Sequence, residues 1–277
     1  MEGRQQGGER SPGEGGSGTI EKLKAHELSD IKHVVAVMSG KGGVGKSSVT
    51  ALLAVRLFRQ GFRAGIMDAD ITGPSIPRMF GLKEQPASLG FGILPVRSQA
   101  GISVMSLNLL LPHEDDPVVW RGPLIASAIR QFWTDVAWGD LDYLLVDLPP
   151  GTGDAPLTVL QSLPLDGLVI VSSPQELAVM VVKKAIKMAG MLGVPILGLV
   201  ENMTYATCPR CGEKLRVFGP SQGERVAQET GVPLLGELPL DPHLAELCDR
   251  GQVEQYEGAV VPLVSALLPL PQRSEKG

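Results

Sequence analysis

The sequence contains few aromatic residues, few cysteines and no long apolar run. Phe, Trp and Tyr make up 4% of its 277 residues, so a buried core must be built from aliphatic side chains. Three cysteines are too few, and odd in number, for the disulfide framework of a small secreted protein. No apolar stretch reaches the ~20 residues of a membrane-spanning helix, and no signal-peptide pattern opens the chain. We therefore expect a soluble, cytoplasmic protein with no membrane partner.

An excess of positive charge is also absent. With 25 Lys and Arg against 30 Asp and Glu, the formal net charge is −5, which argues against a surface that binds nucleic acid. Hydrophobic residues still reach 43%, enough to bury a substantial core. Glycine and proline are plentiful instead, with 34 and 22 residues, so many of them must lie in turns and loops.

Residues 1–30 are predicted to be a disordered Gly-rich tail and lead-in, and residues 31–270 a single domain. Within that domain, short apolar runs lie at 33–38, 63–67, 102–107, 143–146, 168–171, 196–200 and 233–238. Segments of helical character separate most of them, at 46–60, 123–137, 176–192, 221–230 and 242–250. This alternation predicts a three-layer α/β fold with a mostly parallel central sheet flanked by helices. Residues 81–118 give no clear pattern.

Residues 40–47 read G-K-G-G-V-G-K-S and lie between the first apolar run and the first predicted helix. This is the complete phosphate-loop pattern G-x-x-x-x-G-K-[ST]. Its glycines leave backbone N–H groups free for phosphate oxygens, Lys46 can reach the β- and γ-phosphates, and Ser47 can ligate Mg²⁺. We predict a nucleotide contact at Gly40, Lys41, Gly42, Gly43, Val44, Gly45, Lys46, Ser47 and Ser48.

A dinucleotide-binding loop is the alternative interpretation of the same glycines. They also fit G-x-G-x-x-G, and Asp68 lies where a dinucleotide fold places its acidic residue. Such a fold has no use for Lys46 and Ser47 at the start of the helix, so a nucleoside triphosphate is favoured.

Acidic residues follow two other apolar runs, where parallel strands present ligand-binding groups. Asp68 and Asp70 follow the second run, and Asp147 follows the run at 143–146. Asp147 is placed to reach Mg²⁺ directly or through water, and Asp68 to contact the ligands of the ion rather than the ion itself. Asp70 is placed to orient the attacking water. The Pro-Pro-Gly that follows Asp147 predicts a loop whose Gly151 amide senses the γ-phosphate.

Cys208 and Cys211 form a C-x-x-C pair, which supplies two thiolates to one metal centre. Two ligands are half of a usual zinc or iron–sulfur site, and a second chain related by a two-fold axis would complete it. A half zinc ribbon and a redox-active pair are the alternatives. Cys248 lies in a helical segment and is interpreted as a buried apolar residue.

Lys41 is a second lysine within the phosphate loop and gives it the pattern K-G-G-V-G-K-S. With D-L-P-P-G-T-G-D from Asp147 and V-E-N-M-x-x-x-x-C-P-R-C-G around the cysteines, the sequence resembles the Mrp/Nbp35/ApbC iron–sulfur carrier ATPases. That family lies within the class of MinD, ParA and the nitrogenase iron protein. The resemblance extends over residues 31–260 and includes W-R-G-P at 120–123.

The resemblance implies a P-loop NTPase fold, ATP and Mg²⁺ as cofactors, and slow, switch-like ATP hydrolysis. It implies catalytic roles for Lys41, Lys46 and Asp70, with Lys41 reaching the nucleotide of a partner subunit. In related ATPases an Asn at the position of Asn202 hydrogen-bonds the adenine edge. The loop with Pro239 and Asp241 resembles one that lines the base pocket.

The same resemblance implies a [4Fe–4S] cluster bridged between two subunits by Cys208 and Cys211, on an insertion at residues 203–218. The protein would be a homodimer that assembles or carries the cluster and delivers it to apo-proteins. Some relatives have further cysteines near the N-terminus, but residues 1–30 contain none. A second cluster in that segment is therefore excluded.

A spatial-organising ATPase of the MinD/ParA type, with structural zinc at the C-x-x-C pair, is the alternative function. It would need an amphipathic membrane helix or a basic DNA-binding surface, and prolines interrupt the apolar stretch 260–270. A nitrogenase-reductase-like electron donor would need cysteines in residues 70–82 and 147–161, which have none.

Overall fold

A computed structural model describes residues 22–70, 73, 75–111, 122–258 and 270. Three segments discussed above lie outside the described residues: residues 1–21 of the tail and lead-in predicted over 1–30, the Trp-Arg pair at 120–121 and the stretch 260–269. The lead-in from residue 22 is held by hydrogen bonds, because Leu23 N–H donates to Ser162 O at 3.2 Å and Trp133 Nε1 donates to Leu23 O at 3.0 Å.

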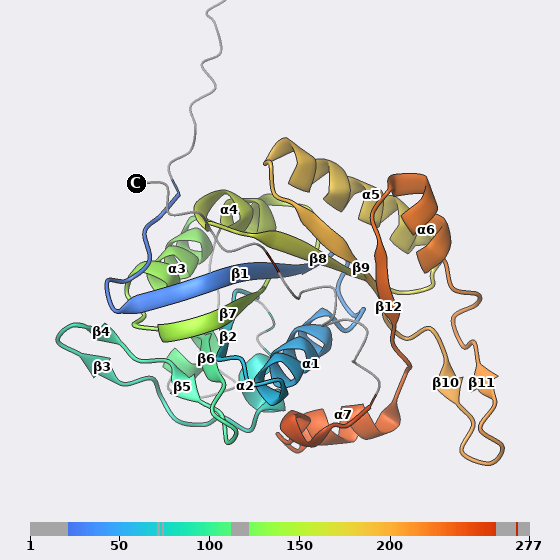
Figure 1. The fold of residues 1–277 in the computed structure, drawn as a ribbon, viewed down its shortest axis with the longest axis horizontal. Helices are drawn as coiled ribbons and strands as arrows, with labels where there is room; N and C mark the ends of the chain where they lie inside the picture. Colours follow the sequence, from blue (N-terminus) through green and yellow to red (C-terminus); the bar gives the residue numbers. More distant parts are fainter. Residues whose placement is uncertain (1–21, 71–72, 74, 112–121, 259–269, 271–277) are drawn as a thin grey trace, which may run out of the picture.

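The predicted fold class is confirmed by a central sheet of eight strands in the order β12-β9-β8-β1-β7-β2-β6-β5 (Figure 1). All neighbours run parallel except β5, which is antiparallel to β6. The strands are β1 (Ser29–Ser39), β2 (Ala64–Asp68), β5 (Val96–Arg97), β6 (Ser103–Ser106), β7 (Gly139–Asp147), β8 (Gly167–Ser172), β9 (Ile196–Glu201) and β12 (Leu234–Glu237).

Helices cover both faces of the sheet (Figure 1). One face packs on α1 (Lys46–Arg59), α2 (Ile76–Met79) and α7 (Pro242–Asp249). The other packs on α3 (Gly122–Thr134), α4 (Asp154–Ser162), α5 (Glu176–Met191) and α6 (Gly223–Thr230). Successive side chains of β1 alternate between the two cores, as the two-residue repeat of a strand requires. No helix in the described ranges has the length and apolar character needed to cross a membrane.

Several short elements were not predicted from the sequence. The helix α4 has a proline at its third position and no long apolar repeat. Residues 81–118 contain the hairpin of β3 (Ser88–Leu89) and β4 (Gly92–Ile93), then β5 and the 3-10 turn η1 (Leu107–Leu110). A second hairpin, β10 (Ala206–Thr207) and β11 (Lys214–Leu215), carries the C-x-x-C pair, and a 3-10 turn η2 (Val253–Gln255) follows α7.

The topology places the predicted nucleotide residues at one edge of the sheet. The strands β1, β7 and β2 are neighbours, and their carboxyl ends lie beside the start of α1. Asp68 and Asp147 are paired across β2 and β7 in register. This edge is therefore where a ligand of an open α/β sheet is expected to bind.

Candidate functional site

The phosphate loop connects β1 to α1, so the first unpaired amides of the helix face it. Gly43 and Gly45 have φ angles of 80° and 78°, a left-handed conformation that favours glycine. A Cβ on Gly45 would also overlap the side-chain amide of Asn202. The loop therefore depends on glycine at position 45 for both its turn and its packing.

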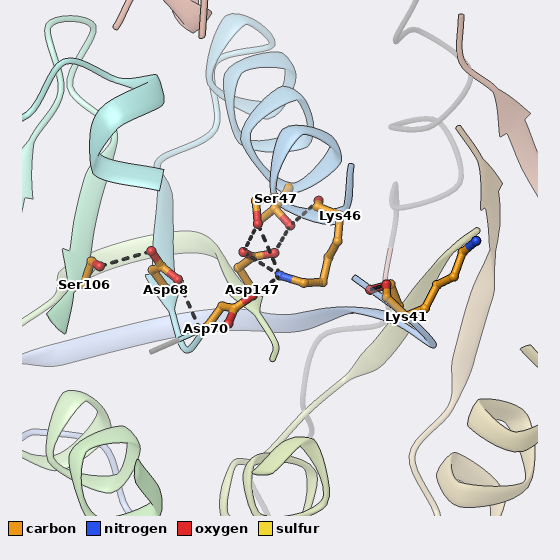
Figure 2. Close-up of polar contacts among 9 residues, drawn as sticks. Lys41, Lys46, Ser47, Asp68, Asp70, Ser106 and Asp147 are labelled. Carbon is orange, nitrogen blue, oxygen red and sulfur yellow. Dashed lines mark hydrogen bonds and ion pairs between the residues drawn. The ribbon is translucent and has the colours of Figure 1, made fainter. Parts of the chain in front are cut away.

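Lys46 is turned toward the acidic residues rather than into solvent, with a relative exposure of 5% (Figure 2). Its Nζ lies 2.8 Å from Asp147 Oδ2, 3.5 Å from Asp70 Oδ2 and 3.2 Å from Ser47 Oγ. One ammonium is thus shared by two carboxylates. The structure brings together Lys46, Ser47, Asp70 and Asp147, as the sequence predicted for a nucleotide site.

Asp147 is completely buried and accepts hydrogen bonds from two hydroxyl groups. Ser47 Oγ donates to Oδ2 at 2.6 Å, and Thr50 Oγ1 donates to Oδ1 at 2.7 Å. Thr50 was missed by the sequence analysis, although its position one helical turn after Lys46 places it on the same face of α1. These partners fix the orientation of the carboxylate and satisfy oxygens that would be costly to bury without hydrogen bonds.

Asp68 is buried as well, and in the view of Figure 2 it lies on the opposite side of Asp70 from Lys46. It accepts hydrogen bonds from Ser106 Oγ at 3.0 Å and from the Asp70 amide at 3.2 Å. Burial and the nearby negative charge of Asp147 raise the pKa of Asp68 to about 8. Ser106, at the end of β6, is a second contact that no motif pointed to.

Two groups predicted to contact phosphate make other contacts in the structure. The Lys41 side chain points away from Lys46 (Figure 2). Its Nζ donates to Oε1 of Gln175, the residue before α5. The Gly151 amide donates to Ser39 O at 2.8 Å. Lys41 does not reach its own chain's phosphate site here, and Gly151 could sense a phosphate only after breaking its hydrogen bond.

A hollow of about 260 Å³ adjoins the phosphate loop and is bounded by α7. It shares Ser48 with a hollow of about 240 Å³ over the loop itself. Three residues predicted to contact the base, Asn202, Pro239 and Asp241, line it. Cys248 lines it as well and is half-buried, and burial raises the pKa of its thiol to about 11. Cys248 is therefore at a pocket wall as well as at the edge of the core.

Asn202 joins this hollow to the phosphate loop. Its Nδ2 donates to Val44 O at 2.9 Å, which fixes the amide orientation because a carbonyl can only accept. The next residue, Met203, has a φ of 60° and is the one non-glycine residue with positive φ in the described part of the chain. Asn202 therefore supports the phosphate loop in addition to any contact with a base.

The two cysteines lie on the β10–β11 hairpin, which projects from the sheet beyond its edge strand β12 (Figure 1). Cys208 N–H donates to Glu213 O and Gly212 N–H donates to Cys208 O, which closes a tight turn. Hydrogen bonds from the Cys211 and Arg210 amides lower the pKa of the Cys208 thiol. Among the described residues no three His, Cys, Asp or Glu side chains gather into a metal site.

Apolar side chains are exposed next to this pair. Relative exposures are 46% for Leu215, 57% for Val217 and 37% for Phe218. Exposed apolar residues close together beside two thiols are typical of a surface that contacts another molecule. One chain thus presents two thiols beside a strip of exposed apolar side chains.

Comparison with known proteins gives relatives over most of the chain. The chain is 50% identical over 226 residues to a protein of Methanocaldococcus jannaschii named "Iron-sulfur cluster carrier protein", covering 81% of this chain and 78% of the relative. It is 41% identical over 261 residues to "Cytosolic Fe-S cluster assembly factor CFD1" of Saccharomyces cerevisiae, covering 89% of each.

A solved structure is similar to this chain over most of its length as well. A nucleotide-binding protein of Archaeoglobus fulgidus, in complex with ADP, matches with a TM-score of 0.75 and 48% identity, over 88% of this chain and 93% of that one. The family model for the ParA group, described as "NUBPL iron-transfer P-loop NTPase", matches residues 30–267. The resemblance found in the sequence is therefore confirmed, and the chain belongs to the ParA family of iron-transfer P-loop NTPases.

Proposed function

We propose that this protein is a homodimeric ATPase that binds a [4Fe–4S] cluster between its two subunits and passes it to apo-proteins. The observation that carries the proposal is the contrast within one chain. A nucleotide cradle is assembled from the chain's own residues, whereas the cysteine hairpin supplies only two thiols beside an exposed apolar strip. The names of the archaeal and yeast relatives support iron–sulfur cargo.

The residues at the phosphate loop fit a magnesium nucleotide. Ser47 Oγ and Asp147 Oδ2 are oxygen donors 2.6 Å apart, and Mg²⁺ prefers oxygen ligands of this kind. When bound, the ion would neutralise phosphate charge. Lys46, which is paired with Asp147 and Asp70, would turn part of its charge to the β- and γ-phosphates, so phosphate contacts would replace part of these ion pairs.

Two residues are proposed to act on the γ-phosphate. Asp70 would accept a proton from the attacking water as the new P–O bond forms and the bond to ADP breaks. Lys41, which points away from its own cradle, would contact the nucleotide of the partner subunit. Because Lys41 and Gly151 must first leave Gln175 and Ser39, hydrolysis is expected to be slow and switch-like.

The cluster is treated as cargo rather than as a resident cofactor. Cys208 and Cys211 of two subunits would supply the four thiolates that a [4Fe–4S] cluster requires. Leu215, Val217 and Phe218 would be covered when the two hairpins meet. An activity in the cytoplasm is supported by the yeast relative, whose name describes a cytosolic factor.

Anaerobic reconstitution with iron and sulfide tests this proposal. We expect a broad visible absorption, four irons for every two chains, and a dimer in size-exclusion chromatography. The double variant Cys208→Ser and Cys211→Ser should lose all three, whereas the matched variant Cys248→Ser should retain them. Colourless protein with stoichiometric zinc, or a cluster held by a monomer, would contradict the proposal.

A further inference from the structure

The β10–β11 hairpin that carries the cysteines projects from the domain (Figure 1) and consists of an outgoing arm, residues 203–207, and a returning arm, residues 214–222. Every residue from 211 to 218, which includes Cys211 and both residues of β11, is exposed. Packing places such a segment less firmly than it places a buried one. The hydrogen bonds at the two ends of the hairpin therefore bear on where the thiols lie.

The outgoing arm is held by the loop that follows β12. Thr204 donates to Leu238 O through both its amide and its hydroxyl, each at 3.0 Å, and the Thr204 side chain is buried. The Leu240 amide donates to Tyr205 O at 2.7 Å. Three hydrogen bonds to a neighbouring segment thus fix the chain that leads into Cys208.

The returning arm is held by one side chain, that of Glu201 at the end of β9. Glu201 Oε2 accepts from Ser221 Oγ, and Oε1 accepts from the Gln222 amide at 2.9 Å. Within the described residues, no other hydrogen bond joins residues 216–222 to the chain outside that segment and α6. Gln222 gives α6 no side-chain cap, so Glu201 supplies an acceptor at the start of that helix from another element.

Glu201 is itself in a fixed position. It is 2% exposed and lies on an interior strand, where it pairs with Ser172 of β8 and Glu237 of β12. The helix α6 begins directly against it, because a Cβ on Gly223 would lie 3.4 Å from Glu201 Oε2 and 2.8 Å from Leu234 Cδ1. A buried acceptor on a rigid element is suited to holding a segment that has little support of its own.

We propose that Glu201 is a positioning residue for the cysteine pair: its carboxylate fixes the returning arm of the hairpin and so sets how the two thiols are presented to the cluster. This inference rests on the proposed cluster-carrier function and adds a residue to it. Glu201 acts through Ser221 and Gln222 rather than as a ligand. Without its carboxylate the hairpin keeps only its outgoing attachment, and the thiols must be ordered when the cluster binds.

The test is the rate at which a ferrous-iron chelator removes iron from the anaerobically reconstituted full chain, without nucleotide. Glu201→Met removes both acceptors at similar volume, and iron loss should become about tenfold faster, the size of one hydrogen bond to a charged group. Ser221→Ala removes one donor and should cause a smaller acceleration. Glu201→Gln should keep the wild-type rate, because its amide can accept from the Gln222 amide and donate to the Ser221 hydroxyl.

Glu237→Met is the matched control, since Glu237 is the register partner of Glu201 on β12 but is exposed. Its rate of iron loss should equal that of wild type. The affinity for a non-hydrolysable ATP analogue with magnesium should stay unchanged in Ser221→Ala, which lies outside the phosphate site. Measured in Glu201→Met, the same affinity reports whether the adjacent Asn202 keeps its contact with the phosphate loop.

Wild-type rates of iron loss in both Glu201→Met and Ser221→Ala would overturn the inference. So would a rate in Glu201→Gln as fast as that in Glu201→Met, or a loss of nucleotide affinity in Glu201→Met as large as the gain in iron loss, because each would indicate a general disturbance of this end of the sheet. If thermal melting shows that Glu201→Met does not fold, a wild-type rate in Ser221→Ala is sufficient to overturn it. A wild-type chain that takes up no cluster contradicts the proposed function, and this inference fails with it.

Discussion

Two regions of the molecule differ in the groups that contact their functional side chains. The first, the phosphate edge, is the cluster of Lys46, Ser47, Asp70 and Asp147 at the carboxyl ends of the strands, and the second is the cysteine hairpin β10–β11. At the phosphate edge Lys46, Ser47 and Thr50 surround the buried carboxylate of Asp147, so the chain satisfies its own charged groups before any ligand arrives. On the hairpin, Cys211 and the apolar side chains next to it are exposed. The first region is preorganised, and the second is the one that we propose another molecule completes.

The comparison has an energetic consequence. Residues of the phosphate edge should matter for the stability of the single chain, because their removal leaves a buried charge unpaired. Residues of the hairpin should matter only for assembly and cargo. The following substitutions test that division, starting with the largest expected effect.

Lys46→Met should abolish measurable nucleotide binding and lower the free energy of unfolding by about 3 kcal/mol, because Asp147 remains buried without its cation. Urea unfolding and a fluorescent nucleotide analogue measure the two effects. Lys32→Met is the matched control, since Lys32 pairs with Asp142 at 2.7 Å on the surface and should cost below about 1 kcal/mol. Equal costs for the two variants would break the comparison.

Asp68→Asn should change how stability depends on pH in the nucleotide-free, magnesium-free protein. The pKa of Asp68 is raised from 3.8 to about 8, so its proton favours the folded state. That contribution is complete below the ordinary carboxyl pKa and is lost as the pH rises through about 8. In the variant, the free energy of unfolding should fall by about 2 kcal/mol less than in wild type as the pH rises through this range, as measured by urea unfolding at each pH. Asp140→Asn, at an exposed carboxylate, is the control. If Asp68→Asn leaves the pH dependence of stability as it is in wild type, the prediction is wrong.

Thr50→Val should destabilise the chain by about 1 kcal/mol and weaken nucleotide binding, because Asp147 loses one of its hydroxyl donors at almost constant volume. Thr158→Val is the matched control, since each hydroxyl lies within 3.1 Å of the carbonyl oxygen four residues earlier in its helix, but Thr158 is only partly buried and has no carboxylate partner among the described residues. A cost at Thr158 as large as that at Thr50 would show that helix propensity, rather than the buried carboxylate, sets the effect.

Phe218→Ser should change the unfolding free energy of the single chain by less than about 0.5 kcal/mol, because the side chain is already partly exposed. Its effect should appear instead as weaker dimerisation, measured by analytical ultracentrifugation of the reconstituted protein. A large loss of stability in the metal-free monomer would show that the hairpin is supported from within the chain, and the contrast with the phosphate edge would fail.

Much of the phosphate edge was accessible from the sequence because its residues obey local rules. Gly45, Lys46 and Ser47 form a contiguous motif, and Asp68 and Asp147 each follow an apolar strand, so topology alone brings them together. Thr50 and Ser106 were not found, because a hydroxyl becomes informative only when the fold places it against a buried carboxylate.

The contacts that went unpredicted are long-range or depend on backbone geometry. The contact of Lys41 with Gln175 joins residues 134 positions apart, and that of Tyr256 with Asp241 depends on where the chain goes after α7. The short strands of the two small hairpins contain two residues each, too few for a periodic pattern.

Met203 lies on the short segment that connects the phosphate edge to the cysteine hairpin. Asn202 is hydrogen-bonded to the phosphate loop, and the C-x-x-C pair begins at Cys208. Met203, whose backbone is left-handed, is the first residue between them. Such a conformation costs a non-glycine residue ~1 kcal/mol or more, so the contacts on either side must hold Met203 in it. We therefore expect a displacement of Asn202 together with the phosphate loop to be transmitted through Met203 to the backbone that leads into the cysteine hairpin.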